Sequence, residues 1–169
     1  MKEQTYRQLA EAVNASAARR SCIIWLNRIV TMAVYLVYPA LLIYLFIHER
    51  GELLPAVLIP GISFILLSIW RDRMNRPRPY EVFGMKPVIS KETKGHSFPS
   101  RHIFCMFLIA VTVFRYAPLP GIIIGVAGAA LAVTRVLGGV HFVKDVVDGA
   151  LIGAGCGIIG FYAILPLFS

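Results

Sequence analysis

A histidine and an aspartate four residues apart, His141 and Asp145, could form a catalytic pair. They would share one face of a helix, because residues four apart are neighbours there. A carboxylate that accepts a hydrogen bond from one imidazole nitrogen fixes the tautomer and frees the other nitrogen to attack. Arg135 precedes His141, and Gly138 and Gly139 between them would allow a tight turn that brings the arginine back over the histidine. This stretch suits phosphate chemistry, but alone it fits a charged loop equally well.

Two earlier clusters, at 71–79 and 97–104, carry the same kinds of side chain. Their candidate residues are Arg71 and Arg78 in the first cluster, and Ser100, Arg101 and His102 in the second. A histidine beside an arginine at the start of an apolar run could be a solvated helix end. It could also be a proton donor next to an anion site, where the helix N-terminus adds its positive dipole end.

The composition is typical of an integral membrane protein. Hydrophobic residues make up 57% of the 169 residues and charged residues 15%, whereas about a quarter of a soluble domain is charged. The formal net charge is +8. Because the arginines cluster between apolar blocks, we expect anionic lipid headgroups or phosphate substrates as partners, and no nucleic acid.

Five apolar blocks are predicted to span the membrane. They cover residues 29–48, 53–70, about 102–116, 120–137 and 149–168. The segment before them, 1–28, has apolar residues at helical spacing among arginines, which predicts an amphipathic interfacial helix. The expected protein is all-α, with an interfacial segment at 1–28 and a single transmembrane domain of about five helices at 29–169.

The order of the spans places all three clusters on one face. The end of the second span, the start of the third, the end of the fourth and the start of the fifth meet there, because successive spans alternate in direction. The opposite face receives the short turns at 48–52 and 116–120. One face is therefore predicted to be functional and the other connective.

The three clusters together resemble a known signature. Arg-x6-Arg-Pro, Pro-Ser-x-His and Arg-x5-His-x3-Asp, in this order, are similar to the three motifs of the type 2 phosphatidic acid phosphatase superfamily, which includes vanadium haloperoxidases and bacterial acid phosphatases. The resemblance covers residues 53–168. It implies the helical bundle of that family and a metal-independent phosphatase without a cofactor.

The resemblance also implies a role for each candidate residue. His141 would be the nucleophile that forms a phosphohistidine, and Asp145 would orient it. His102 would protonate the leaving group and then activate water. The phosphate would be held by Arg71, Arg78 and Arg135, with Ser100 and the backbone amide of Arg101. Such positioning and charge stabilisation are what phosphoryl transfer requires, and the chain has no acidic cluster suited to Mg²⁺.

Three positions depart from the family pattern. Arg71 stands where the family usually has lysine, Thr134 where it has serine, and Arg101 where it has glycine. The Arg101 guanidinium could reach a second phosphate, a headgroup or only water. We favour a contact with substrate.

The expected function is hydrolysis of a lipid phosphate or diphosphate. Phosphatidic acid, phosphatidylglycerol phosphate and undecaprenyl diphosphate are candidate substrates, and the sequence does not choose among them or give the oligomeric state. The alternative is a non-catalytic lipid-phosphate binder with a degenerate site, against which His102, His141 and Asp145 argue. A transporter is disfavoured because the charges gather at one face and not at mid-membrane.

The membrane orientation is predicted from two conflicting signals. Basic residues in the N-terminal segment and in 71–101 would place the functional face inside the cell. The family resemblance implies a site facing outward. Because several of these arginines are assigned to phosphate, they report poorly on topology, and we expect an extracytoplasmic site in the cell membrane.

Overall fold

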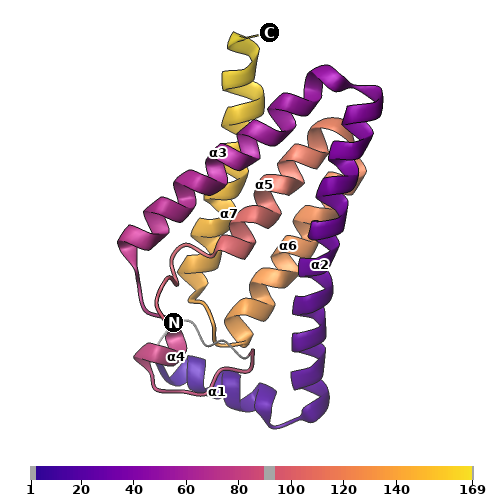
Figure 1. The fold of residues 1–169 in the computed structure, drawn as a ribbon. Coiled ribbons are helices and arrows are strands. Elements are labelled where there is room, and N and C mark those ends of the chain that lie inside the picture. Colours follow the sequence, from indigo (N-terminus) through magenta and orange to yellow (C-terminus); the bar gives the residue numbers. More distant parts are fainter. Residues whose placement is uncertain (1–2, 90–93, 169) are drawn as a thin grey trace.

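The computed structural model describes residues 3–89 and 94–168, and the regular structure in this part of the chain is helical (Figure 1). In chain order the helices are α1 (Glu3–Asn14), α2 (Ala17–His48), α3 (Arg50–Met74), α4 (Pro79–Val82), α5 (Arg101–Tyr116), α6 (Pro118–Leu137) and α7 (Val143–Ile158). A π-helical turn, η1 (Ile159–Ile164), and a 3-10 turn, η2 (Leu165–Leu167), continue α7.

The N-terminal segment forms two helices and not the single amphipathic helix predicted for 1–28. α1 ends at Asn14, and α2 runs without a break from Ala17 to His48, so no helix boundary lies at residue 28. Ser16 is the N-cap of α2, where its hydroxyl accepts the backbone N–H of Arg19 at 3.5 Å. Serine is a favoured N-cap residue, and this start signal was overlooked because apolar residues continue at helical spacing on both sides of it.

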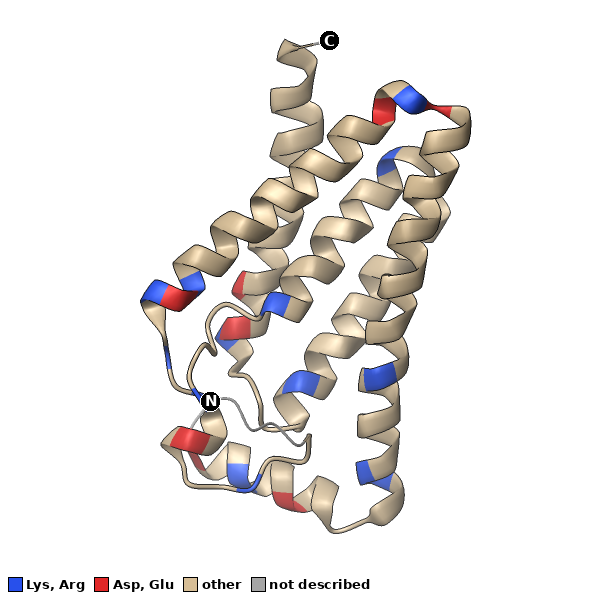
Figure 2. Cartoon of the chain, in the orientation of Figure 1, with Lys and Arg blue, Asp and Glu red and all other residues tan. Residues whose placement is uncertain are grey.

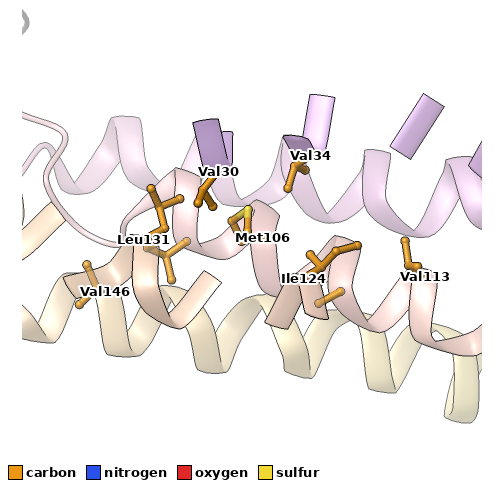
Figure 3. Close-up of a cluster of buried hydrophobic side chains, with 9 residues drawn as sticks. Val30, Val34, Met106, Val113, Ile124, Leu131 and Val146 are labelled. Atoms are coloured by element: carbon orange, nitrogen blue, oxygen red, sulfur yellow. The ribbon is translucent and has the colours of Figure 1, made fainter. Parts of the chain in front are cut away.

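α5 is the central helix of the bundle. It packs along α6 and α7, while α2 covers α5 and α6, and α3 covers α5 and α7. The largest apolar cluster joins α2, α5, α6 and α7 through Val30, Val34, Met106, Leu131 and Val146 (Figure 3). The helix that begins with the second motif is thereby enclosed by the helices that carry the other two.

The close approach of α5 and α7 depends on glycine. A Cβ atom at Gly153 would lie 2.3 Å from the carbonyl oxygen of Phe104, and one at Gly149 would lie 2.8 Å from the carbonyl oxygen of Ser100. Small residues at helix interfaces let membrane helices approach backbone to backbone. In this chain that contact fixes the start of α5 against the first turns of α7.

Four helical stretches in the described part of the chain are long and apolar enough to cross a bilayer, and not the predicted five. They are Ala17–His48, Arg50–Val82, Pro118–Leu137 and Val143–Leu167. The predicted third span is α5, which has 16 residues and is therefore about 24 Å long, short of the ~30 Å hydrocarbon thickness. Four of the five predicted spans therefore match long apolar helices, and the third block forms a shorter helix that the other helices of the bundle enclose.

The outer helices expose apolar side chains and the charges gather at the two ends of the bundle (Figure 2). Large apolar residues that face outward include Trp25, Leu36, Leu66, Val126 and Leu151. The ends of α3 and α6 and the starts of α5 and α7 lie at the same end of the bundle (Figure 1). The predicted placement of the three clusters at one end of the bundle is confirmed.

The glycine contact gives a stability prediction. We expect Gly153→Ala to destabilise the protein by roughly 1–3 kcal/mol, because the new methyl group meets a backbone atom that cannot turn away. Gly155→Ala is the matched control, since nothing lies within 4 Å of a Cβ built there on the same helix. Thermal unfolding in detergent measures both variants. Equal melting temperatures would contradict the assigned contact.

Candidate active site

The structure brings the predicted residues to one end of the bundle from five segments. Arg71 lies in the last turn of α3 and Arg78 is the N-cap of α4. Ser100 is the N-cap of α5, and Arg135 lies in the last turn of α6. His141 precedes α7, and Asp145 lies in the first turn of α7. Arg101 and His102 lie at the start of α5.

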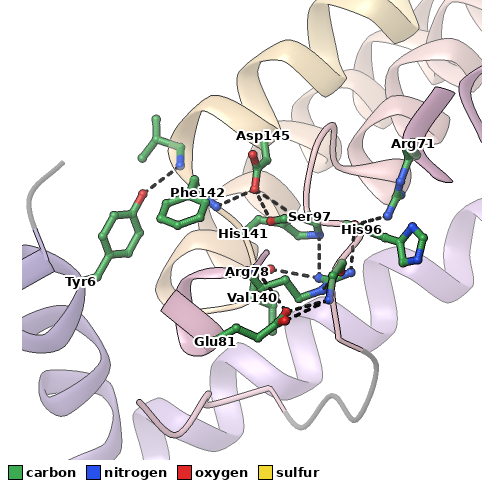
Figure 4. Close-up of polar contacts among 12 residues, drawn as sticks. Tyr6, Arg71, Arg78, Glu81, His96, Ser97, Val140, His141, Phe142 and Asp145 are labelled. Atoms are coloured by element: carbon green, nitrogen blue, oxygen red, sulfur yellow. Dashed lines mark hydrogen bonds and ion pairs between the residues drawn. The ribbon is translucent and has the colours of Figure 1, made fainter. Parts of the chain in front are cut away.

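His141 and Asp145 form a buried pair at the centre of this arrangement (Figure 4). Their Nδ1 and Oδ2 atoms are 3.5 Å apart, and the two residues are 1% and 4% exposed. The pair does not lie along one helix, because His141 stands in the loop before α7. The carboxylate faces Nδ1, which favours a proton on that nitrogen and leaves the lone pair on Nε2.

Asp145 is held by groups that the sequence analysis did not single out. Its Oδ2 accepts hydrogen bonds from the Ser97 hydroxyl and, at 2.9 Å, from the backbone N–H of Phe142 (Figure 4). Its carbonyl oxygen accepts the backbone N–H of Ser100 at 2.8 Å. A buried carboxylate requires such donors, because burial without them is costly. Ser97 lies in the second cluster, three residues before Ser100. Its hydroxyl group in that cluster was the signal from which the sequence could have identified it as a site residue.

Arg78 is fixed in front of His141 by backbone carbonyl groups. Its guanidinium donates to the carbonyl oxygens of Gly95 at 2.9 Å, Val140 at 3.0 Å and His96 at 3.2 Å. Its Nη1 atom is also 3.5 Å from Nε2 of His141. Any group transferred to Nε2 would therefore meet a positive charge that is already in position.

Glu81 supports Arg78 and was also missed from the sequence. Its carboxylate accepts the backbone N–H of Arg78 at 3.1 Å and that of Gly95 at 2.9 Å. The three-residue spacing between Arg78 and Glu81 is that of a capping box, with an unusual residue at the N-cap. Glu81 thus joins the first motif to the loop that leads into the second.

Arg71, Arg135 and Ser100 surround the pair with further polar groups. Arg71 is buried and donates to the same His96 carbonyl oxygen as Arg78. Among the described residues, Arg135 Nε and Ser100 Oγ are buried without a hydrogen-bond partner. Unpaired donors of this kind are costly to bury, and a bound anion that accepts from either of them would remove that cost.

The turn between Arg135 and His141 follows the sequence prediction. Gly139 has a φ of +71°, a conformation that favours glycine. The backbone N–H of Val140 returns to the carbonyl oxygen of Arg135 at 3.2 Å. The turn therefore places Arg135 close enough for its charge to act on His141.

His141 is held as a neutral imidazole. Burial lowers its pKa well below the ordinary value, and the charges of Arg78 and Arg135 act in the same direction, while Asp145 opposes them. Burial disfavours the charged form of an imidazole. Nε2 therefore keeps its lone pair at neutral pH, as nucleophilic attack requires.

Arg101 and His102 face a cavity beside the buried pair. The cavity has a volume of about 360 Å³ and opens between α2, α3, α5 and α6. Most of its wall is apolar, with Tyr35, Tyr38 and Phe64 among the lining side chains. Arg101 is exposed and lies with its Cζ atom 5.8 Å from the Phe64 ring centre. A cationic group and a histidine from the start of α5 thus line a mostly apolar cavity, whereas the buried arginines and the His141–Asp145 pair do not line it.

The described residues contain no group of three His, Cys, Asp or Glu side chains that could hold a metal ion. The charge at this site comes mainly from the buried arginines Arg71, Arg78 and Arg135.

Comparisons with solved structures identify the same fold in other proteins. The crystal structure of LpxE from Aquifex aeolicus matches with a TM-score of 0.70 and 26% identity, covering 90% of this chain and 92% of that one. A PAP2 type phosphatidylglycerolphosphate phosphatase from Bacillus subtilis matches with a TM-score of 0.60 over 93% of this chain and 90% of that one. At 22% identity the second likeness supports the fold alone.

Sequence comparison gives a relative and a family. The bacitracin transport permease protein BcrC of Bacillus licheniformis is 28% identical over 110 residues, which cover 63% of this chain and 54% of BcrC. The match therefore spans about half the length of that relative. The family model of the PAP2 superfamily matches residues 52–168. With all three motifs inside that range and well over half of the chain matched, this multi-pass membrane protein belongs to the PAP2 superfamily.

Proposed function

We propose that the protein is a lipid phosphatase that hydrolyses a phosphate monoester or diphosphate of a lipid through a phosphohistidine. The observation that carries this proposal is the buried His141–Asp145 pair, whose free Nε2 faces Arg78 at 3.5 Å.

The proposed reaction has two steps. In the first, Nε2 of His141 attacks the terminal phosphorus and the bond from that phosphorus to the leaving oxygen breaks. The leaving oxygen is the lipid oxygen of a monoester or the bridging oxygen of a diphosphate, and His102 gives its proton to it. In the second, His102 takes a proton from water, the resulting hydroxide attacks phosphorus, and the P–N bond breaks to release inorganic phosphate. Asp145 stabilises His141 throughout.

The arginines and Ser100 would hold the phosphoryl oxygens in both steps. Arg71, Arg78 and Arg135 are buried, so their interactions with an anion are little screened by water. Ser100 Oγ and Arg135 Nε are two of the buried side-chain atoms that have no hydrogen-bond partner within the described part of the chain. The backbone amide of Arg101, at the N-terminus of α5, adds a further donor in the proposed site.

The apolar cavity supports a lipid substrate over a soluble one. It is lined by Arg101 and His102 at the site and by apolar residues of α2 and α5 along its length. A lipid chain in this cavity would place its phosphate beside Arg101 and His102, at the N-terminus of α5 that Ser100 caps. Phosphatidic acid, phosphatidylglycerol phosphate and undecaprenyl diphosphate all fit this description, so the choice among them rests on a substrate panel.

A non-catalytic lipid-phosphate binder is the second candidate. Such a binder would need the arginines but not a histidine polarised by a carboxylate. Binding alone therefore does not explain the three groups that donate hydrogen bonds to Asp145. A measurement of turnover distinguishes the two candidates, because only a phosphatase would release phosphate from the lipid.

Replacing the proposed nucleophile tests the reaction. We expect His141→Ala to lower phosphate release from phosphatidic acid in detergent by more than about 10³-fold, because covalent catalysis is lost with Nε2. EDTA in the assay should leave wild-type turnover unchanged. Alkaline quenching during turnover of a radiolabelled lipid should trap phosphate on the wild type only.

The matched control is His48→Ala, which removes an exposed histidine at the connective face. Thermal unfolding shows whether each variant is folded. Unchanged turnover in folded His141→Ala would exclude the mechanism, and activity that disappears with EDTA and returns with Mg²⁺ would point to a different one.

Arg101 is proposed to bind a second anionic group of the substrate. It has no ion pair among the described residues, and its charge acts on Arg71. We expect Arg101→Ala to lower kcat/KM for a polyprenyl diphosphate roughly tenfold more than for phosphatidic acid, as loss of a charged hydrogen bond implies. Arg73→Ala, at an exposed arginine of the same face, is the control. An equal loss on both lipids would refute this role.

The site is proposed to face the extracytoplasmic side. Arg50, the first residue of α3, and Lys86, which follows α4, are both exposed. The start of α3 and the helix α4 lie at opposite ends of the bundle (Figure 1). In a variant whose native cysteines are replaced by serine, Lys86→Cys should react with an impermeant maleimide in intact cells. Arg50→Cys should react only after permeabilisation. The reverse pattern would place the site in the cytoplasm.

A further inference from the structure

Tyr6 contacts the N-terminus of the helix that carries Asp145. Its ring is 3% exposed, and its hydroxyl oxygen accepts the backbone N–H of Val143 at 3.0 Å (Figure 4). Val143 is the first residue of α7. Burial raises the pKa of Tyr6, and the negative charge of Asp145 acts in the same direction. The hydroxyl therefore stays protonated and lies within electrostatic reach of the proposed catalytic carboxylate.

Tyr6 and Asp145 each accept one N–H group at the N-terminus of α7. The first N–H groups of a helix have no partner within the helix. Asp145 Oδ2 accepts the N–H of Phe142, and Tyr6 accepts that of Val143. Without the Tyr6 hydroxyl, the Val143 N–H would be left to compete for the Asp145 carboxylate, which is the group that orients His141.

Aromatic contacts extend the link from α1 to two motifs. The Tyr6 ring centre lies 5.8 Å from that of Phe83 and 5.5 Å from that of Phe142, and the two phenylalanines are 5.9 Å apart. Phe83 is the C-cap of α4, the short helix whose N-cap is Arg78, and Phe142 directly follows His141. Arg7 adds a hydrogen bond to the carbonyl oxygen of Phe83.

The rest of α1 follows the same face. Ala10 and Val13 are buried at helical spacing from Tyr6. Val13 belongs to a cluster with Ile23 and Val88, against which Leu137 at the end of α6 packs. This face of α1 is thus covered by the loops and helix ends around the site, in contrast to a helix that only rests on a membrane surface.

We propose that α1 is part of the catalytic scaffold and that Tyr6 is a positioning residue for the Asp145–His141 pair. The proposal rests on the proposed phosphatase function for its kinetic consequence. It assigns a role to a helix that lies outside residues 52–168, the part matched by the family model. Tyr6 acts through the start of α7 and does not touch the substrate.

Tyr6→Phe tests the proposal because it removes the hydroxyl and keeps the ring. We expect kcat to fall roughly tenfold. This is a smaller loss than the ~10²-fold that a 1 Å misplacement of a catalytic group can cause. KM and inhibition by inorganic phosphate should stay within about twofold, because the arginines are untouched.

Tyr116→Phe is the matched control at the opposite end of the bundle. It removes a half-buried hydroxyl that donates to Glu52 Oε2 at 2.9 Å. Both variants lose one partly buried hydrogen bond, so thermal unfolding should shift similarly, while only Tyr6→Phe should lose kcat. An equal kcat in the two folded variants would overturn the proposal.

Amide hydrogen exchange provides a readout without turnover. Residues 142–146 should exchange faster in Tyr6→Phe than in the wild type, and at the wild-type rate in Tyr116→Phe. If the wild type shows no phosphatase activity, the proposed function fails, but this exchange difference still decides whether Tyr6 holds α7. No difference at 142–146 would overturn the positioning role whatever the activity.

Discussion

The buried carboxylate of Asp145 is the constraint on which the site depends. Removing one partner of a buried ion pair leaves an uncompensated charge and typically costs about 3–5 kcal/mol, so the surrounding chain must keep Asp145 satisfied. Donors from Ser97, Phe142 and His141 meet at its Oδ2 atom. The glycine contact between α5 and α7 brings the residue before α5 within reach of the same turn. Helix packing and the alignment of His141 are therefore parts of one arrangement.

The buried arginines carry the opposite charge to Asp145, and the surrounding chain must stabilise that charge as well. Arg71, Arg78 and Arg135 are all buried near one another, and among the described ion pairs none joins them to a carboxylate. Backbone carbonyl oxygens of the loop before α5 hold Arg71 and Arg78 instead. Carbonyl dipoles fix the guanidinium groups without neutralising them. The site thus retains a positive potential that an anionic phosphoryl group would relieve, and such preorganised charge is what phosphoryl transfer uses.

The sequence was sufficient for the order and direction of the helices and for the motif residues, because apolar blocks and short motifs are local signals. It was insufficient where tertiary contacts decide. The sequence of α5 has the apolar composition of a membrane span, although its side chains are buried largely by the other helices of the bundle. Ser16 divides a stretch whose apolar spacing continues on both sides. Glu81 and Ser97 act on groups 14 and 48 residues away in the chain, and Tyr6 acts on a residue 137 positions away. Their roles follow from loop geometry, which sequence spacing does not encode.

The loop from Gly95 to Ser100 contacts both the buried arginines and the buried Asp145. Its Gly95 and His96 carbonyl oxygens hold arginines, while its Ser97 hydroxyl and the Ser100 N–H hold Asp145. The same segment begins α5 and so places His102 at the cavity. A displacement of this loop would therefore alter the cationic and anionic halves of the site together. This coupling explains why Glu81, which binds the N–H of Gly95, belongs to the machinery of the site although it need not approach a substrate.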